Sequence, residues 1–268
     1  RMEPWYLWEW MNYEQMRGSF AVMEYWSLAS GREQQEWLDL SGHAAAVFDW
    51  NLQKMLKVMC ESNGTFNMKN LDHPSLLGLE PDYTVTFVES HDTYAPMKSK
   101  DERGIFQSKM LAYAYILFQN GLPMVYYHDY YLQPYHDGTL DDPPNTNRCK
   151  PSGYFGTPLK QQIDTGIWIR KQFLSGVPAY VVTNSDVQGD LYVAIRDGGG
   201  VKSGGMLVLN DATSSRSTTV TTPWLGTTLR DAYTRNSAYD VTTLADGTAS
   251  LTATGKCFRV YVPLSALP

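Results

Sequence analysis

The chain has 268 residues, and its 22 Lys and Arg against 28 Asp and Glu give a formal net charge of −6. An acidic chain lacks the positive footprint of a nucleic-acid-binding protein, and no uninterrupted apolar run reaches the ~18 residues of a membrane-spanning helix. We therefore expect neither a nucleic-acid nor a membrane partner. The hydrophobic content of 43% argues against disorder, and the length suits one large domain or one domain plus a smaller one.

Neither the start of the chain nor the spacing of its cysteines matches a known functional pattern. Residues 1–5 contain no charged leader followed by an apolar core, so this stretch is not typical of a signal peptide. The three cysteines (Cys60, Cys149 and Cys257) lie far apart without metal-binding spacing, and we interpret them as buried small hydrophobic residues. The histidines outside the motifs below fit no ligand pattern, and we assign no metal ligand in the chain; these histidines are His43, His73 and His136.

The first two-thirds of the chain alternate between strand-like and helix-like stretches. Short apolar runs predict four strands, near 20–23, 44–48, 84–88 and 123–127. Apolar residues at helical spacing predict helices over 2–16, 52–59, 103–120 and 158–173. Such alternation predicts an α/β fold with a parallel sheet, whose strands are buried on both faces.

The composition changes after about Pro178. Strand-like segments are separated there by stretches rich in Gly, Ser and Thr, and helical periodicity is absent; the segments are 179–183, 190–195, 205–209 and 257–262. We therefore predict two domains, an α/β domain over 1–177 and an antiparallel β domain over 178–268.

The first polar strand end is Glu24, which follows an apolar run and precedes Tyr25 and Trp26. A carboxylate flanked by apolar and aromatic groups loses hydration, which favours its protonated form and suits it to donating a proton. Trp26 could stack on a sugar ring. The alternative is that Glu24 caps the following helix.

Polar residues also follow the other three runs. His91 and Asp92 end the third run and could bind vicinal hydroxyls or a metal, or could simply cap a turn. His128 and Asp129 end the fourth run, where a turn is as plausible as a site. Asp49 ends the second run and is placed to cap the helix that follows it.

Taken in order, these motifs resemble the C-terminal half of the α-amylase family of retaining glycoside hydrolases (glycoside hydrolase family 13), with a likeness to bacterial liquefying-type enzymes. The motif at 20–26 is similar to the family's fifth barrel strand, and that at 47–49 to the sixth. The motif at 86–93 resembles the seventh strand, and that at 121–129 the eighth. The resemblance implies the second half of a (β/α)8 TIM barrel, followed by a C-terminal antiparallel β-sandwich.

The resemblance also implies roles for individual residues in the cleavage of α-1,4-glucans such as starch or glycogen. Glu24 corresponds to the general acid/base. Asp92 corresponds to the second carboxylate that holds the sugar hydroxyls, and His91 hydrogen-bonds the same hydroxyls. Tyr25 and Trp26 would flank the leaving group.

Two residues depart from the family pattern. Ser90 stands where the family usually has Asn, and His128 stands where it usually has Gly. These departures keep open the alternative of a catalytically degenerate chain that binds glycans or serves a structural role.

The family's nucleophile, on barrel strand four, has no counterpart in this sequence, because residues 1–4 resemble the stretch just beyond it. A retaining glycosidase needs two carboxyl groups about 5–5.5 Å apart. We therefore expect the chain alone to be inactive and an N-terminal half of the barrel, as a bound chain or a missing segment, to complete the site. The resemblance further implies calcium, held by ligands upstream of this chain, and an extracellular location.

Overall fold

The computed structural model of the chain describes residues 2–26, 30–93, 104–105, 107–131, 159–182 and 189–268. Phe106, within the predicted third helix, lies outside the described residues, as do His136 and Cys149. No helix in the described part of the chain is long and apolar enough to cross a membrane.

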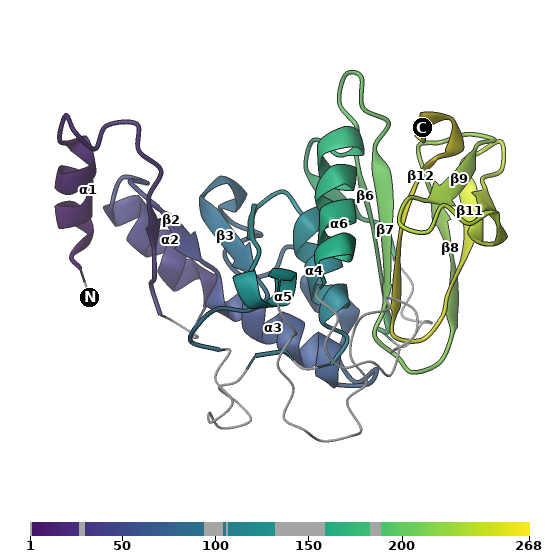
Figure 1. Ribbon diagram of the computed structural model, residues 1–268, viewed down its shortest axis with the longest axis horizontal. Helices are drawn as coiled ribbons and strands as arrows, with labels where there is room; N and C mark the ends of the chain where they lie inside the picture. The colour runs from purple at the N-terminus through teal and green to yellow at the C-terminus, as the bar shows by residue number, and fades with distance from the viewer. Residues whose placement is uncertain (1, 27–29, 94–103, 106, 132–158, 183–188) are drawn as a thin grey trace.

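Four parallel strands form the first sheet, in the same order in space as in sequence (Figure 1). They are β1 (Val22–Met23), β2 (Ala46–Phe48), β3 (Thr84–Phe87) and β4 (Leu122–Met124). The predicted parallel α/β arrangement is therefore confirmed, with each strand within its predicted run or one residue from it. The expected burial on both faces holds only for the central strands β2 and β3. Val22 in β1 is 38% exposed and Leu122 in β4 is 36% exposed, because these two strands form the edges of the described sheet.

Helices alternate with these strands, and the predicted ones are present. They are α1 (Pro4–Asn12), α3 (Trp50–Glu61), α4 (Lys109–Phe118) and α6 (Lys160–Phe173). Two more, α2 (Gly31–Leu40) and α5 (Tyr127–Tyr131), were not predicted, nor were the short 3-10 helices η1 (Met68–Leu71) and η2 (Pro81–Tyr83). The helical spacing of Trp5, Trp8 and Met11 predicts one apolar face for α1, and this prediction is wrong. Trp5 and Trp8 are exposed, whereas Leu7 is buried in a cluster with residues of α2.

The C-terminal part is antiparallel throughout its described strands, as predicted. Its larger sheet has the order β10-β9-β12-β7-β6-β5, and β11 pairs with β8 in a second sheet. The six strands are β5 (Pro178–Tyr180), β6 (Leu191–Arg196), β7 (Gly205–Asn210), β9 (Thr228–Asp231), β10 (Val241–Thr242) and β12 (Cys257–Pro263); the pair is β8 (Arg216–Thr221) and β11 (Thr248–Ala253). The 3-10 helices η4 (Ser237–Tyr239) and η5 (Leu264–Ala266) complete this part. Apolar residues from both sheets share one core, among them Val208, Val220 and Leu251.

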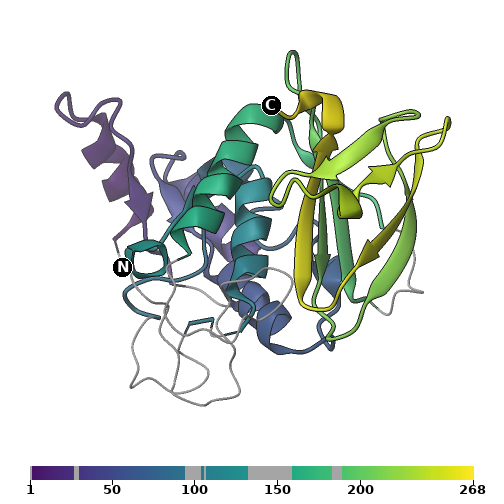
Figure 2. The same cartoon turned by 45° about the vertical axis from the view of Figure 1, so that its right-hand side comes forward.

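Helix α4 joins the two parts of the molecule. All ten of its residues are buried, and its apolar side chains share a core with α3 and α6 on one side and with β6, β7 and β12 on the other. Both views place α4 and α6 between the parallel sheet and the antiparallel sheets (Figures 1 and 2). The first antiparallel strand begins at Pro178, where the composition changes, but the core crosses that position, and the division into two domains stays a prediction.

The last carbonyls of α4 are capped by two arginines. Arg196 on β6 donates from Nη1 to Phe118 O at 2.7 Å and to Gln119 O at 2.8 Å. Arg170 on α6 donates to Leu117 O at 3.0 Å and to Gly121 O at 2.8 Å. Carbonyls at a helix C-terminus have no partner within the helix, and a cation there also favours the helix dipole.

Two cysteines behave differently. Cys60 is fully buried and free, as interpreted from the sequence. Cys257 is disulfide-bonded, which corrects the interpretation of all three cysteines as isolated apolar residues.

Candidate active site

Polar residues follow the carboxyl ends of the parallel strands, and we call this edge of the sheet the rim. Glu24 directly follows β1, and the segment 89–92 follows β3. Asp129 lies within α5, five residues after the end of β4. Because all four strands are parallel, their carboxyl ends meet at one edge of the sheet. The rim therefore collects the residues that the sequence singled out.

Glu24 is solvent-exposed. Its apolar neighbours in sequence therefore do not bury it in the described structure, and the desolvation expected for it is not seen. The alternative helix-capping role is wrong, because Ser30 is the N-cap of α2 and accepts a hydrogen bond from Glu33 N at 3.3 Å. Glu24 is thus left as an accessible carboxyl group at the rim.

The two aromatic residues after Glu24 differ in accessibility. Tyr25 is half-buried; its hydroxyl donates to Glu33 Oε1 at 2.9 Å, and its ring lies 5.8 Å from that of Trp37. Trp26 is 51% exposed and packs one side on buried Trp50, with ring centroids 4.1 Å apart. Trp26 therefore presents an aromatic surface at the rim, whereas Tyr25 is held against α2.

His91 and Asp92 lie in a tight turn after β3. Ser90 Oγ accepts from Asp92 N at 3.2 Å, and Ser90 N donates to Thr93 Oγ1 at 2.9 Å, so side chains of the segment itself hold the turn. His91 Nε2 lies 3.5 Å from Asp92 Oδ2, and both side chains are accessible, at 85% and 39% exposure. An imidazole and a carboxylate in this position can hydrogen-bond adjacent sugar hydroxyls.

A fully buried charge network lies directly beneath the rim. Lys109 Nζ is 3.1 Å from Glu89 Oε2 and 2.8 Å from Asp129 Oδ1, and the hydroxyl of Tyr113 donates to Asp129 Oδ2 at 2.6 Å. The Thr93 hydroxyl donates to the other oxygen of Glu89. The network thereby ties the segments after β3 and β4 to the start of α4.

Burial and charge act in opposite directions on the pKa values within this network. Burial raises the pKa of Glu89, against the opposing effect of Lys109. Burial alone would lower the pKa of Lys109, but the carboxylates of Asp129 and Glu89 outweigh it and raise that pKa above its usual value. Burial, followed by the negative charge of Asp129, raises the pKa of Tyr113 well above its usual value. Lys109 is therefore firmly cationic, and Tyr113 is a hydrogen-bond donor.

Sequence reasoning missed Glu89 and Lys109, although it noted Asp129. The available signal was a lysine at the start of an otherwise apolar helical stretch, 109–118. Such a lysine is buried only when it is paired.

Asp49 is a structural residue, as its position suggested. Its side chain is fully buried and accepts from Leu52 N at 2.9 Å, capping α3. It also accepts from Ser75 Oγ at 2.6 Å and from Leu77 N at 3.0 Å, and burial raises its pKa.

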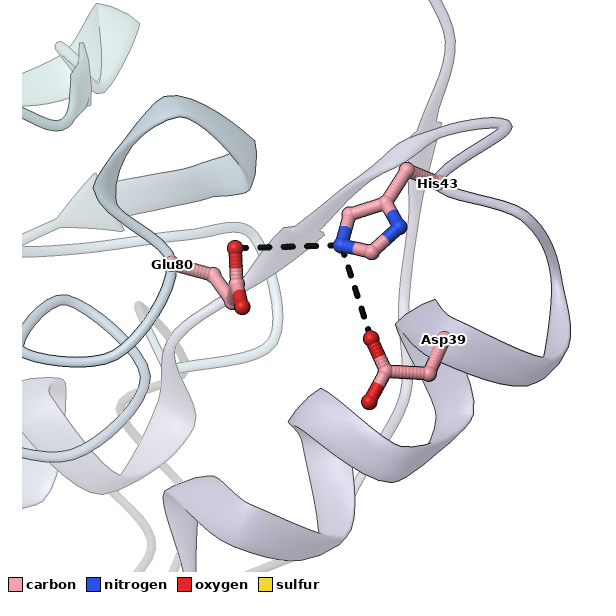
Figure 3. Close-up of side chains that lie close together, drawn as sticks. All are labelled: Asp39, His43 and Glu80. Carbon is pink, nitrogen blue, oxygen red and sulfur yellow. Dashed lines mark ion pairs between the residues drawn. The ribbon is translucent and has the colours of Figure 1, made fainter.

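Within the described residues, one group of side chains could hold a metal ion, and it lies away from the rim. Asp39, His43 and Glu80 converge near the amino ends of β2 and β3 (Figure 3). Calcium takes six to eight oxygen ligands. A single imidazole and two carboxylates do not fit that requirement, so we assign no calcium site to these residues.

Comparisons with known proteins find similarity to α-amylases. A family model described as "Alpha-amylase C-terminal" matches residues 206–262. An α-amylase of Geobacillus stearothermophilus is 31% identical over 171 residues, which cover 63% of this chain and 28% of that protein. An α-amylase of Bacillus licheniformis is 29% identical over 188 residues, which cover 69% of this chain and 33% of that protein. The chain thus spans about a third of the length of these curated relatives.

Solved structures match the fold over nearly the whole chain. A cyclomaltodextrin glucanotransferase with a three-domain ABC distribution superposes with a TM-score of 0.66 and 19% identity, covering 97% of this chain and 54% of that one. An α-amylase from Malbranchea cinnamomea superposes with a TM-score of 0.63 and 15% identity, covering 94% of this chain and 52% of that one. At these identities the likeness concerns the fold.

Proposed function

The chain belongs to the α-amylase family, of which it is a C-terminal portion, and from this premise we propose that it forms part of a retaining glycoside hydrolase that cleaves α-1,4-linked glucans. The observation that carries the proposal is the shared edge of the parallel strands, where Glu24 and the His91–Asp92 pair are both accessible.

In this proposal the four parallel strands are the second half of a (β/α)8 barrel, and the two antiparallel sheets are its C-terminal β-sandwich. The N-terminal half of the barrel, in the same polypeptide or in a bound one, supplies the nucleophilic carboxylate. Support comes from the lengths of the structural relatives, of which this chain covers about half. An extracellular location and the absence of nucleic-acid or membrane partners belong to the same proposal.

Glu24 acts as the general acid and then as the general base. Its carboxyl proton passes to the glycosidic oxygen while the bond between C1 and that oxygen breaks and the nucleophilic carboxylate bonds to C1. In the second step Glu24 takes a proton from water, whose oxygen replaces the carboxylate at C1, so that the anomeric configuration is retained. Exposure at the rim gives Glu24 access to both the substrate and water.

The other rim residues bind the sugar. Asp92 and His91 hold the hydroxyls of the ring being cleaved, and the exposed face of Trp26 stacks on a neighbouring sugar. Tyr25 acts as a positioning residue, because its hydroxyl is engaged with Glu33 on α2.

The test is carried out on the protein expressed from its natural gene, with any segment or chain that accompanies this one. Glu24→Gln should lower starch hydrolysis by more than about 100-fold, as expected for the loss of acid/base catalysis. Asp92→Asn should also abolish hydrolysis, because the hydroxyls of the ring being cleaved lose their carboxylate partner. An activated aryl glycoside, whose leaving group needs no protonation, should partly restore turnover by the Glu24 variant but not by the Asp92 variant. Glu36→Gln, an exposed carboxylate on α2, is the matched control and should retain activity.

Parental activity in both rim variants would remove the catalytic assignment. If the parent protein instead shows no hydrolysis but binds maltooligosaccharides, and Trp26→Ala abolishes this binding, a catalytically degenerate glycan-binding chain is favoured.

A further inference from the structure

At the opposite end of the parallel sheet from the rim, one imidazole nitrogen faces two carboxylates. Asp39 lies in the last turn of α2, His43 in the connection to β2, and Glu80 just before η2 and β3. His43 Nε2 is 3.7 Å from Asp39 Oδ1 and 3.7 Å from Glu80 Oε2, and the three ligand atoms lie within 4.8 Å of one another (Figure 3). We propose that these three side chains bind one Zn²⁺ ion.

The backbone after α2 brings His43 into this position. His43 has a left-handed φ of 54°, follows Gly42 with a φ of 60°, and donates its N–H to Leu38 O at 2.9 Å. A non-glycine residue adopts positive φ at an energetic cost, so the surrounding structure must hold it there. Its ring packs edge-on against Tyr83, with centroids 4.7 Å apart, which fixes the direction of the imidazole.

Glu80 is also fixed before any ion binds. Its Oε1 accepts from Gln35 Nε2 at 2.9 Å, which leaves Oε2 facing His43. Its backbone carbonyl accepts from Thr84 Oγ1 at 2.6 Å. A carboxylate that is itself hydrogen-bonded is the usual arrangement for a metal ligand, because the outer contact orients the inner one.

The distances suit an ion better than direct hydrogen bonds. At 3.7 Å, each nitrogen–oxygen separation exceeds the 2.7–3.2 Å of a hydrogen bond. Ligands at ~2.0–2.2 Å around a tetrahedral Zn²⁺ are separated by about 3.3–3.6 Å from one another. The two distances from His43 Nε2 therefore need to shorten by a few tenths of an ångström at most, and the two carboxylate oxygens, within 4.8 Å of each other, need to approach to the same spacing.

The donor set favours Zn²⁺ over Ca²⁺ and Mg²⁺. One nitrogen and two carboxylate oxygens are ligands that Zn²⁺ accepts, whereas Ca²⁺ and Mg²⁺ require oxygen alone. Asp39 is 59% exposed on its side chain, which leaves room for water as the fourth ligand. Because Asp39 is the most accessible of the three, it is also the ligand most free to adjust.

The position of the site indicates its role. Zn²⁺ would link the end of α2 to the segment that enters β3, which are neighbours in space but distant in sequence. Zn²⁺ that binds the folded state but not the unfolded state would raise the thermal stability of the chain. Since the site lies at the other end of the sheet from Glu24, we infer a structural ion that is independent of the proposed hydrolysis.

The test uses the full chain, freed of metal by a chelator and titrated with zinc sulfate at pH 7.5 against a chromogenic competitor. The parent should bind one Zn²⁺ per chain and gain several degrees in Tm. His43→Ala, Asp39→Asn and Glu80→Gln should each weaken the binding at least tenfold. Co²⁺ at the same site should give the intense visible absorption of a four-coordinate ion, and this absorption should be lost in the three variants.

His73→Ala is the matched control. His73 Nδ1 lies 2.7 Å from Asp72 Oδ1, so these two residues also form a histidine–carboxylate pair. Neither residue belongs to the group Asp39, His43 and Glu80. Its removal should leave Zn²⁺ affinity unchanged.

The proposal is overturned if the parent shows no saturable binding, or if the three variants bind Zn²⁺ as tightly as the parent does. Should His43→Ala fail to fold, the Asp39→Asn variant decides, because the exposed position of that residue makes it tolerant of substitution.

Discussion

Replacing Lys109 by methionine would test the buried network beneath the rim most directly. Methionine keeps much of the volume of the lysine stem but removes the charge that faces Glu89 and Asp129. Removing one partner of a buried ion pair costs about 3–5 kcal/mol, because the remaining charge stays buried without compensation. At about 2–4 °C per kcal/mol for a chain of this size, Tm should fall by about 6–20 °C.

The loss should also depend on pH, with a sign fixed by Glu89. Burial raises the pKa of Glu89, so the folded chain holds this proton more tightly than the unfolded chain does, and stability falls as pH rises through the folded pKa. Without Lys109 that pKa rises further. The variant should therefore be destabilised more at pH 8 than at pH 5, where protonation relieves the repulsion between the two carboxylates.

The assay is thermal unfolding followed by circular dichroism at both pH values. Lys160→Met is the control, since Lys160 is exposed and pairs with Asp164 at 2.5 Å, and exposed pairs contribute little to stability. A loss in the Lys109 variant that matches this control, or that is equal at pH 5 and pH 8, would refute the reasoning.

Three further predictions concern other buried groups. Burial raises the pKa of the Cys60 thiol to about 12, so iodoacetamide should label Cys60 at pH 8 only after urea unfolds the chain; mass spectrometry of native and unfolded samples would decide. Burial also raises the pKa of Asp211 to about 7, so stability should fall as pH rises through 7, and urea titrations at pH 5 and pH 9 should show Asp211→Asn losing less stability over that range than the parent. A Cβ at Gly104 would overlap the carboxylate of Glu89, so Gly104→Ala should cost about 1–3 kcal/mol; an unchanged Tm would contradict the packing described here.

The features that could be predicted from the sequence are those set by local patterns. The apolar runs 44–48 and 84–88 predict β2 and β3 because central parallel strands are apolar on both faces. The shared edge then follows from the parallel arrangement alone. Strands β8 and β11 were not predicted. In β8, threonine occupies both the buried face, as Thr218 does, and the exposed face, as Thr219 does, so the sequence shows no alternation of apolar and polar residues.

The features that could not be predicted depend on contacts between residues distant in sequence. Lys109 meets Glu89 only after α4 packs beneath the ends of β3 and β4. His43 stands four residues after Asp39, which suggests one helical face, but α2 ends at Leu40 and a left-handed turn places the ring instead. Glu80 joins these two residues from the segment just before η2 and β3, which the spacing of the sequence does not indicate.

The burial of α4 on all sides limits how the protein can be re-engineered. Exchanging everything after Pro178 for another module would remove the arginine of β6 that caps α4 and the apolar residues of β7 and β12 that cover it. The transplanted chain would present that uncovered helix to water and tend to aggregate. A fusion that preserves solubility must therefore carry β6, β7 and β12 along with the parallel sheet, and the workable junction lies within the antiparallel part, away from the change in composition.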